Sequence, residues 1–166
     1  MNLKYHIVNE NHLKPFIPDL RSMEKNIAYP LEDGTESFFI DHGKDYSPFF
    51  TQQGHKTRFL IITNKDKVAG SIAGVWKRIS FNKKTYNALY ASDLKLIPKY
   101  RNRGVVKSFL WYLFIRWPFT KEFQGWDFIY FCAMQRENKG VDSTFKGLHL
   151  GKLTKPNCLL NIYILE

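Results

Sequence analysis

The chain has 166 residues, of which 44% are hydrophobic and 24% charged, so its composition is that of a folded protein rather than a disordered one. Lysine and arginine total 25 against 15 acidic residues, which gives a formal net charge of +10. A basic surface attracts polyanions, and nucleic acid, an anionic membrane face and a phosphorylated cofactor are all compatible with it.

The cysteines and the apolar stretches argue against a metal-binding, a secreted or a membrane-spanning protein. Cys132 and Cys158 lie in apolar runs, and we expect both to be buried, reduced thiols. No Cys/His cluster indicates a metal site. The first residues lack the apolar core of a signal peptide, and no apolar stretch has the length that spans a bilayer. We therefore expect a cytoplasmic protein without a membrane partner.

The N-terminal third predicts a short strand at residues 4–8, then helix and loop. Apolar residues at helical spacing predict a helix from His12 to about Lys25, with two prolines in its first turn. Residues 27–36 have the composition of a loop. Residues 37–50 mix aromatic residues with Asp, His and Gly and show no period, and a short helix is expected after Ser47.

The following residues have a β pattern. Three strands are expected at residues 58–63, 68–81 and 86–97. The tight turns between them, at residues 64–67 and 82–84, predict an antiparallel meander.

Pro98 ends the third strand and a helix follows from Gly104 to Trp117. It is apolar nearly all round, which predicts that it is well buried. Residues 128–133 are typical of a central strand and residues 159–165 of a last one. The strand–helix–strand order predicts a βαβ unit with two parallel neighbouring strands.

The connection between the third strand and this helix carries the strongest functional signal. Lys99, Arg101 and Arg103 crowd one turn, and Gly104 stands directly before the helix. A helix start offers unpaired N–H groups and positive potential, which suit phosphate, and guanidinium groups strengthen such a site. The residues alone leave a phosphate site and a solvated basic turn about equally open.

The stretch from Leu96 to Val106 resembles the acetyl-CoA-binding signature of the GNAT superfamily of N-acetyltransferases, Gln/Arg-x-x-Gly-x-Gly/Ala after a strand that ends in an apolar-x-Pro sequence. The loop residues match in order as Arg101, Asn102, Arg103, Gly104 and Val105, and Val106 stands where the family prefers Gly or Ala. The similarity extends over roughly residues 58–138. It implies an α/β fold of the α+β type, with a central mixed, mostly antiparallel twisted sheet, one βαβ unit and flanking helices.

The resemblance implies an N-acyltransferase that moves an acetyl or other acyl group from acyl-CoA to an amine by direct attack on the thioester. Acetyl-CoA or another acyl-CoA would bind to strand main chain, to the loop and to an asparagine after the βαβ unit. The implied residues are Leu94, Lys95, Leu96, Arg101, Asn102, Arg103, Gly104, Val105, Val106 and Asn138. A strand amide would stabilise the developing oxyanion.

Asp93 is the candidate general base. It alternates onto the strand face of Leu89 and Ala91, whose apolar setting would make its carboxylate a stronger base. The alternative is an aspartate paired with a lysine such as Lys95. The family often places a tyrosine acid where this chain has Phe145, so Tyr130 is the candidate proton donor.

The acceptor side would be built from residues 38–50, where the family has its acceptor-binding loops. A cationic amine would meet polar groups between aromatic walls, and the candidates are Asp41, His42, Asp45 and Tyr46. The alternative is a packed aromatic loop in which His42 has only a structural role.

Three functions stay open: the acyltransferase, a GNAT-like domain that binds acyl-CoA as a sensor or interaction module without turnover, and, last, a nucleic-acid-binding protein, for which no motif is present. We expect one GNAT-like domain over residues 1–166. Six strands are countable where the family has seven, and residues 148–152 are a candidate for a short extra strand. Otherwise the domain lacks its last strand, whose place another chain would fill, or belongs to a longer chain. Family members often form homodimers, but no feature of this sequence fixes the oligomeric state.

Overall fold

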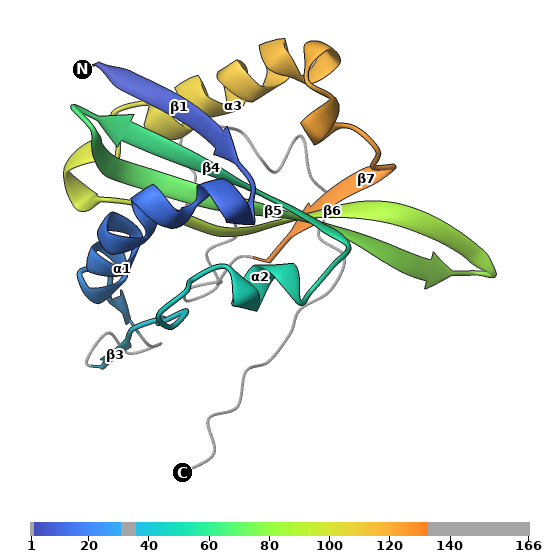
Figure 1. Cartoon of the computed structure of the whole chain (residues 1–166), viewed down its shortest axis with the longest axis horizontal. Helices are drawn as coiled ribbons and strands as arrows, with labels where there is room; N and C mark the ends of the chain where they lie inside the picture. Colours follow the sequence, from blue (N-terminus) through green and yellow to red (C-terminus); the bar gives the residue numbers. More distant parts are fainter. Residues whose placement is uncertain (1, 31–35, 133–166) are drawn as a thin grey trace. The chain divides into compact units, whose positions relative to one another are not determined.

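A computed structural model describes residues 2–30 and 36–132, which belong to one compact unit of the chain. The centre of this unit is a five-stranded sheet in the order β1-β4-β5-β6-β7 (Figure 1). Its strands are β1 (Leu3–Val8), β4 (Lys56–Asn64), β5 (Lys67–Phe81), β6 (Lys84–Leu96) and β7 (Phe128–Phe131). A separate two-stranded ribbon pairs β2 (Tyr29–Pro30) with β3 (Ser37–Phe38). The strand expected at residues 159–165 lies outside the described residues, and a single domain over the whole chain stays a prediction.

The strand pairing confirms the predicted fold class. β1, β4, β5 and β6 pair antiparallel in turn, and β6 pairs parallel with β7. Both tight turns of the meander have two successive residues at positive φ, Lys65 with Asp66 and Asn82 with Lys83. Such turns match the right-handed twist of the strands that they join.

Within the described ranges three α-helices flank the sheet: α1 (Ile17–Lys25), α2 (Pro48–Thr51) and α3 (Val105–Arg116). Short 3-10 turns occupy Glu10–His12, Lys14–Phe16, Pro98–Tyr100, Trp117–Phe119 and Lys121–Phe123. The predicted start of the first helix at His12 is wrong, because two 3-10 turns precede Ile17. Pro15 has no N–H to donate and stands in the second of these turns, whereas Pro18 is tolerated in the first turn of α1.

Alternating residues of β4 show how the sheet separates two cores. Phe59 and Ile61 pack with the residues of α1 and α2, whereas Leu60 and Ile62 pack with those of α3. This is the period of two expected of a strand that is buried on both faces. The helices α1 and α2 therefore cover one face of the sheet and α3 covers the other (Figure 1).

The burial predicted for α3 is wrong. Only Val105 and Phe109 are fully buried in this helix, and most of its large apolar side chains are exposed. The helix contacts the sheet on one side, and none of the described residues covers the other. Cys132 is also exposed, contrary to expectation, and Cys158 lies outside the described residues. In the part of the chain that the structure describes, no helix combines the length and apolarity needed to cross a bilayer.

Candidate functional site

A β-bulge interrupts β6 at Asp93. Ser71 of β5 pairs with Lys95 and Ala73 pairs with Ser92, so Asp93 and Leu94 together face one residue of β5. Asp93 has φ +57°, a left-handed conformation that Asp tolerates better than most residues. Bulges of this kind redirect a side chain and are common beside active sites.

Three ionisable side chains meet in the buried region between this bulge and α1. Lys95 Nζ lies 2.7 Å from Glu24 Oε1 and 2.8 Å from Asp93 Oδ1. The exposed fractions of these side chains are 0% for Lys95, 3% for Glu24 and 7% for Asp93. Charges so far from water persist only when they are paired. The apolar setting expected around Asp93 is therefore wrong, and the structure shows its alternative, an ion pair with Lys95.

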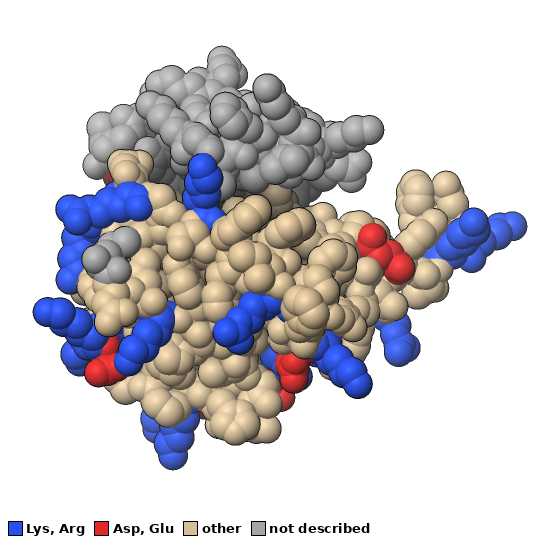
Figure 2. All heavy atoms as spheres, turned by 90° about the horizontal axis from the view of Figure 1, so that it is seen from above, with Lys and Arg blue, Asp and Glu red and all other residues tan. Residues whose placement is uncertain are grey.

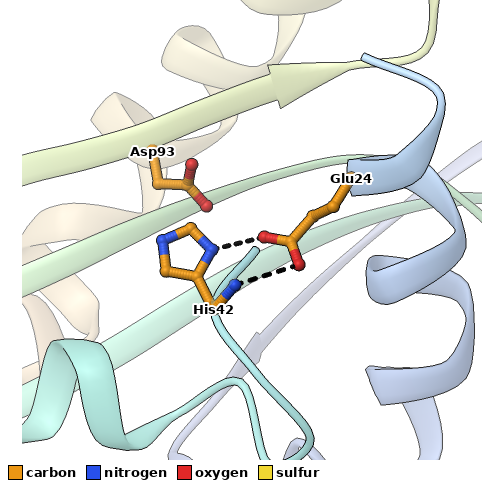
Figure 3. Close-up of side chains that lie close together, drawn as sticks. All are labelled: Glu24, His42 and Asp93. Carbon is orange, nitrogen blue, oxygen red and sulfur yellow. Dashed lines mark hydrogen bonds and ion pairs between the residues drawn. The ribbon is translucent and has the colours of Figure 1, made fainter. Parts of the chain in front are cut away.

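The loop before α2 adds His42, which Figure 3 shows beside Glu24 and Asp93, and it also adds Tyr46. His42 Nδ1 bonds to Glu24 Oε1, and because a carboxylate only accepts, Nδ1 carries the proton. The hydroxyl of Tyr46 donates to Asp93 Oδ2 at 2.8 Å. We define the buried ionic cluster as Glu24, His42, Tyr46, Asp93 and Lys95.

The electrostatics of the buried ionic cluster keep Glu24 ionised. Burial alone raises the pKa of Glu24, but the hydrogen bonds from His42 and Lys95 outweigh it and hold the pKa below the usual carboxyl value. Burial and the nearby charge of Asp93 raise the pKa of Tyr46, so this phenol stays protonated. Tyr46 also has φ +58°, which is rare for a bulky residue, and strain of this kind concentrates at functional sites.

The donor set of this cluster also resembles that of a metal site. Glu24, His42 and Asp93 each offer a ligand atom, and these atoms lie within 4.8 Å of one another. However, the ammonium group of Lys95 already bonds to both carboxylates, and a metal cation would have to displace it. We therefore assign these contacts to internal ion pairs.

The other two predicted acceptor residues do not join the cluster. Asp41 and Asp45 are exposed, and their contacts are local. Asp41 Oδ1 accepts a hydrogen bond from the N–H of Gly43, and the main-chain carbonyl of Asp45 accepts one from the N–H of Ser47. Asp41 does border a hollow of about 280 Å³ that reaches Glu24. Sequence reasoning missed Glu24, whose only signal is an acidic residue at a core-facing position of the α1 pattern.

The pairing between β6 and β7 ends just before the bulge. The parallel ladder runs from the pair Ala88 and Phe128 to the pair Ala91 and Phe131, where β7 ends. On the edge of β6 that faces β7, residues 92–96 have no partner strand among residues 2–30 and 36–132, so the main-chain groups of Leu94, Lys95 and Leu96 have no strand pairing there within this part of the chain. Tyr130 pairs with Tyr90 and stacks on its ring at 4.9 Å. Burial, with the neighbouring Tyr90, raises the pKa of Tyr130.

The basic loop Arg101–Gly104 directly precedes α3, as predicted. Gly104 has φ +71°, and a Cβ atom there would meet nothing within 4 Å. The first backbone bond of the helix joins the N–H of Ser108 to the Gly104 carbonyl, so the N–H groups of Val105, Val106 and Lys107 find no acceptor within the helix. A hollow of about 450 Å³ adjoins this end, lined by Gly104, Lys107, Ser108 and Trp111.

The structure describes the three predicted loop residues Arg101, Asn102 and Arg103, but not the implied ligand Asn138. Arg101 and Arg103 are both exposed, and Arg101 Nε donates to the Leu96 carbonyl at 3.0 Å, which anchors the loop to β6. Asn102 has φ +57° and is exposed. Asn138 and Phe145 lie outside the described residues.

Comparison with solved structures finds the same architecture in acetyltransferases. One is an aminoglycoside acetyltransferase from an uncultured soil metagenomic sample, in complex with trehalose, which is 16% identical to this chain with a TM-score of 0.62. The match covers 99% of this chain and 97% of the chain of that protein. Another is the aminoglycoside acetyltransferase AAC(6')-Iy, bound to a bisubstrate analogue that contains CoA, which is 13% identical to this chain with a TM-score of 0.58. The match covers 100% of this chain and 99% of the chain of that protein. The chain thus has the fold of GNAT acetyltransferases, which confirms the expectation from the loop at the level of fold.

Comparison of sequences adds one relative. A protein of Amsacta moorei entomopoxvirus, provisionally named glycylpeptide N-tetradecanoyltransferase, is 39% identical over 102 residues. The match covers 61% of this chain and 29% of that protein, so the chain spans less than a third of the length of this curated relative. No family model matches the chain.

Proposed function

We propose that this chain carries an acyl-CoA-dependent N-acyltransferase activity, in which an amine attacks the thioester directly. The observation that supports it best is the position of two features on one connection. The edge of β6 at residues 92–96, which has no strand partner among the described residues, leads within a few residues into the basic loop and into the first N–H groups of α3, which have no acceptor within the helix. The first suits the amide-rich arm of CoA and the second suits its pyrophosphate.

The cofactor roles follow residue by residue. Main-chain groups of Leu94, Lys95 and Leu96 would pair with the extended arm, and one amide would stabilise the oxyanion. Gly104 and the N–H groups of Val105 and Val106 would receive the pyrophosphate, with Arg101 and Arg103 beside it. Asn102 would shape the loop, and Asn138 stays a proposed ligand from the resemblance.

The proton of the attacking amine has two candidate acceptors, Asp93 and His42. Asp93 is already bonded to the Lys95 ammonium and to the Tyr46 hydroxyl, so an attacking amine would compete with both donors for its carboxylate. His42 donates from Nδ1 to Glu24, so Nε2 is the ring nitrogen that would accept the proton of the amine. Tyr130, whose raised pKa keeps the hydroxyl protonated, is the proposed donor to the leaving thiolate.

The acyl group and the acceptor are proposed from the relatives. The printed name of the viral relative specifies a tetradecanoyl group and a glycylpeptide, whereas structures that share the fold at 16% and 13% identity act on aminoglycosides. The higher identity of the viral protein favours a long-chain acyl-CoA and a peptide amine. His42, Tyr46 and the exposed Asp41 and Asp45 would then border the acceptor.

Calorimetry with acetyl-CoA, tetradecanoyl-CoA and CoA tests the cofactor. We expect binding of at least one thioester, and a loss of about tenfold or more in affinity in Arg101→Ala/Arg103→Ala, because two phosphate contacts are removed. The matched control is Lys14→Ala/Lys25→Ala, which removes the same charge from the opposite face of the sheet. Equal affinity in wild type and the arginine variant would exclude the loop as the phosphate site.

Thiol release then tests turnover, with a glycine-terminated peptide and an aminoglycoside as acceptors. Release that requires an acceptor establishes transfer. Binding without release in any pairing would support the second candidate, a domain that holds acyl-CoA as a sensor or interaction module. Phe145 favours that candidate, because it has no proton to give where the family often has tyrosine.

A further inference from the structure

The side of α3 turned away from the sheet is an apolar surface. Trp111, Phe114 and Ile115 expose 62%, 64% and 53% of their area, and Trp111 and Phe114 stack at 5.6 Å. Leu110 shares this side of the helix, and the turn that follows adds Trp117 and Phe119, both exposed. We call these six residues the α3 outer face. Isolated exposed apolar residues are ordinary, but a contiguous group marks a contact surface.

The chain around the α3 outer face is basic throughout. Residues 96–121 contain no Asp or Glu and six basic residues, all of them exposed: Lys99, Arg101, Arg103, Lys107, Arg116 and Lys121. Figure 2 looks onto the molecule from the α3 side and shows blue groups spread over a mostly tan surface with few red ones. The surface therefore combines exposed indole, phenyl and aliphatic groups with predominantly positive charge.

We propose that the α3 outer face docks on an anionic membrane surface. Aromatic side chains, tryptophan above all, settle at the headgroup level, while lysine and arginine attract acidic lipids. Two other partners fit less well. Nucleic acid would use the charge and the rings but gains little from Leu110 and Ile115, and two copies of this chain would bring like-charged faces together. The proposal revises the expectation of no membrane partner and holds whether or not the chain transfers an acyl group.

Sedimentation with lipid vesicles tests the proposal on the full chain. We expect at least tenfold tighter binding to vesicles of phosphatidylcholine with phosphatidylserine than to phosphatidylcholine alone. Trp111→Ser/Phe114→Ser and, separately, Arg116→Glu/Lys121→Glu should each lower binding to the anionic vesicles at least tenfold. The matched controls are Phe81→Ser, an exposed aromatic residue of β5, and Lys14→Glu/Lys25→Glu, which makes the same charge change elsewhere. Circular dichroism of every variant should match that of the wild type, because all these side chains are exposed.

Several results would overturn the proposal. One is wild type that fails to bind phosphatidylserine vesicles. Another is undiminished binding by Trp111→Ser/Phe114→Ser, which would show that charge alone is responsible. Losses in the control variants as large as those in the α3 variants would show that binding does not depend on this face. A wild-type dimer in analytical ultracentrifugation that dissociates in the Trp111→Ser/Phe114→Ser variant would assign the face to a second copy. An oligonucleotide bound more tightly than the vesicles, and lost in the same variant, would assign it to nucleic acid.

Discussion

Glu24 is the residue on which the buried ionic cluster depends, because its carboxylate holds both His42 and Lys95. A buried ion pair adds little net stability compared with apolar residues of the same shape, yet removing one partner leaves the other charge buried alone. Glu24 therefore fixes the relative positions of three elements, α1, the loop before α2 and the bulge of β6.

Glu24→Gln should lower the free energy of unfolding by about 3–5 kcal/mol, because Lys95 then keeps its charge with one carboxylate fewer. Urea unfolding at neutral pH measures it. Glu10→Gln, at an exposed position, is the matched control and should stay within about 0.5 kcal/mol of wild type. Equal stability of the two variants would mean that the ion pairs do not form in solution.

The acid stability of the unit should also depend on Glu24. Its folded pKa lies below the usual value of 4.5, so its contribution is complete above that value and is lost as the pH falls through the lower folded pKa. Urea midpoints measured from neutral pH downward should fall in this acidic window for wild type and fall less steeply for Glu24→Gln. Parallel curves for the two proteins would contradict the lowered pKa.

Single substitutions separate the two proposed proton acceptors. Asp93→Asn should lower kcat with little change in acyl-CoA affinity, by about 10²–10⁴-fold if Asp93 itself accepts the proton. His42→Gln should instead remove the ionisation from the pH profile of kcat/KM if His42 Nε2 is the acceptor. Profiles of wild-type shape in both variants would place the acceptor elsewhere.

At the scale of elements, the sequence predicts the strands, turns and helix starts that depend on neighbouring residues along the chain. Alternation along β4 and the turn residues at 64–67 and 82–84 determine the meander, and Gly104 determines where α3 starts. The burial of α3 was not predictable, because its composition does not say how many neighbours cover it. The buried ionic cluster was not predictable either, since it joins residues from Glu24 to Lys95 and depends on the left-handed backbone of Tyr46 and Asp93.

The start of α3 gives a prediction about Gly104. Gly104→Ala should destabilise the unit by about 1–2 kcal/mol, because the φ of +71° is costly for an L-residue, although a methyl group has room there. Gly104→Asn should cost less, since Asn tolerates this conformation. Thermal unfolding compares the two variants with Gly125→Ala, another open glycine at positive φ. A smaller loss for Ala than for Asn would contradict a conformational cause.

At the scale of the whole molecule, the net charge of +10 should accelerate capture of an anionic cofactor. We expect the association rate of acyl-CoA, measured by stopped flow, to fall steeply between low and physiological salt, with a smaller change in the dissociation rate. Lys14→Ala/Lys25→Ala, remote from the loop, should keep most of this salt dependence. A rate that is independent of salt would show that the charge does not steer the cofactor.

The hairpin of β5 and β6 extends beyond the rest of the sheet (Figure 1). β4 follows β5 only to Trp76, and β7 joins β6 at Ala88, so among the described residues Lys77–Asn87 has no further strand on either side. A two-stranded ribbon is marginal by itself, and the lysines on this one discourage pairing with other chains. Its amides should therefore exchange with deuterium by local opening, progressively faster from Lys77 to the tip at Phe81, while the centre of β5 exchanges only through global unfolding.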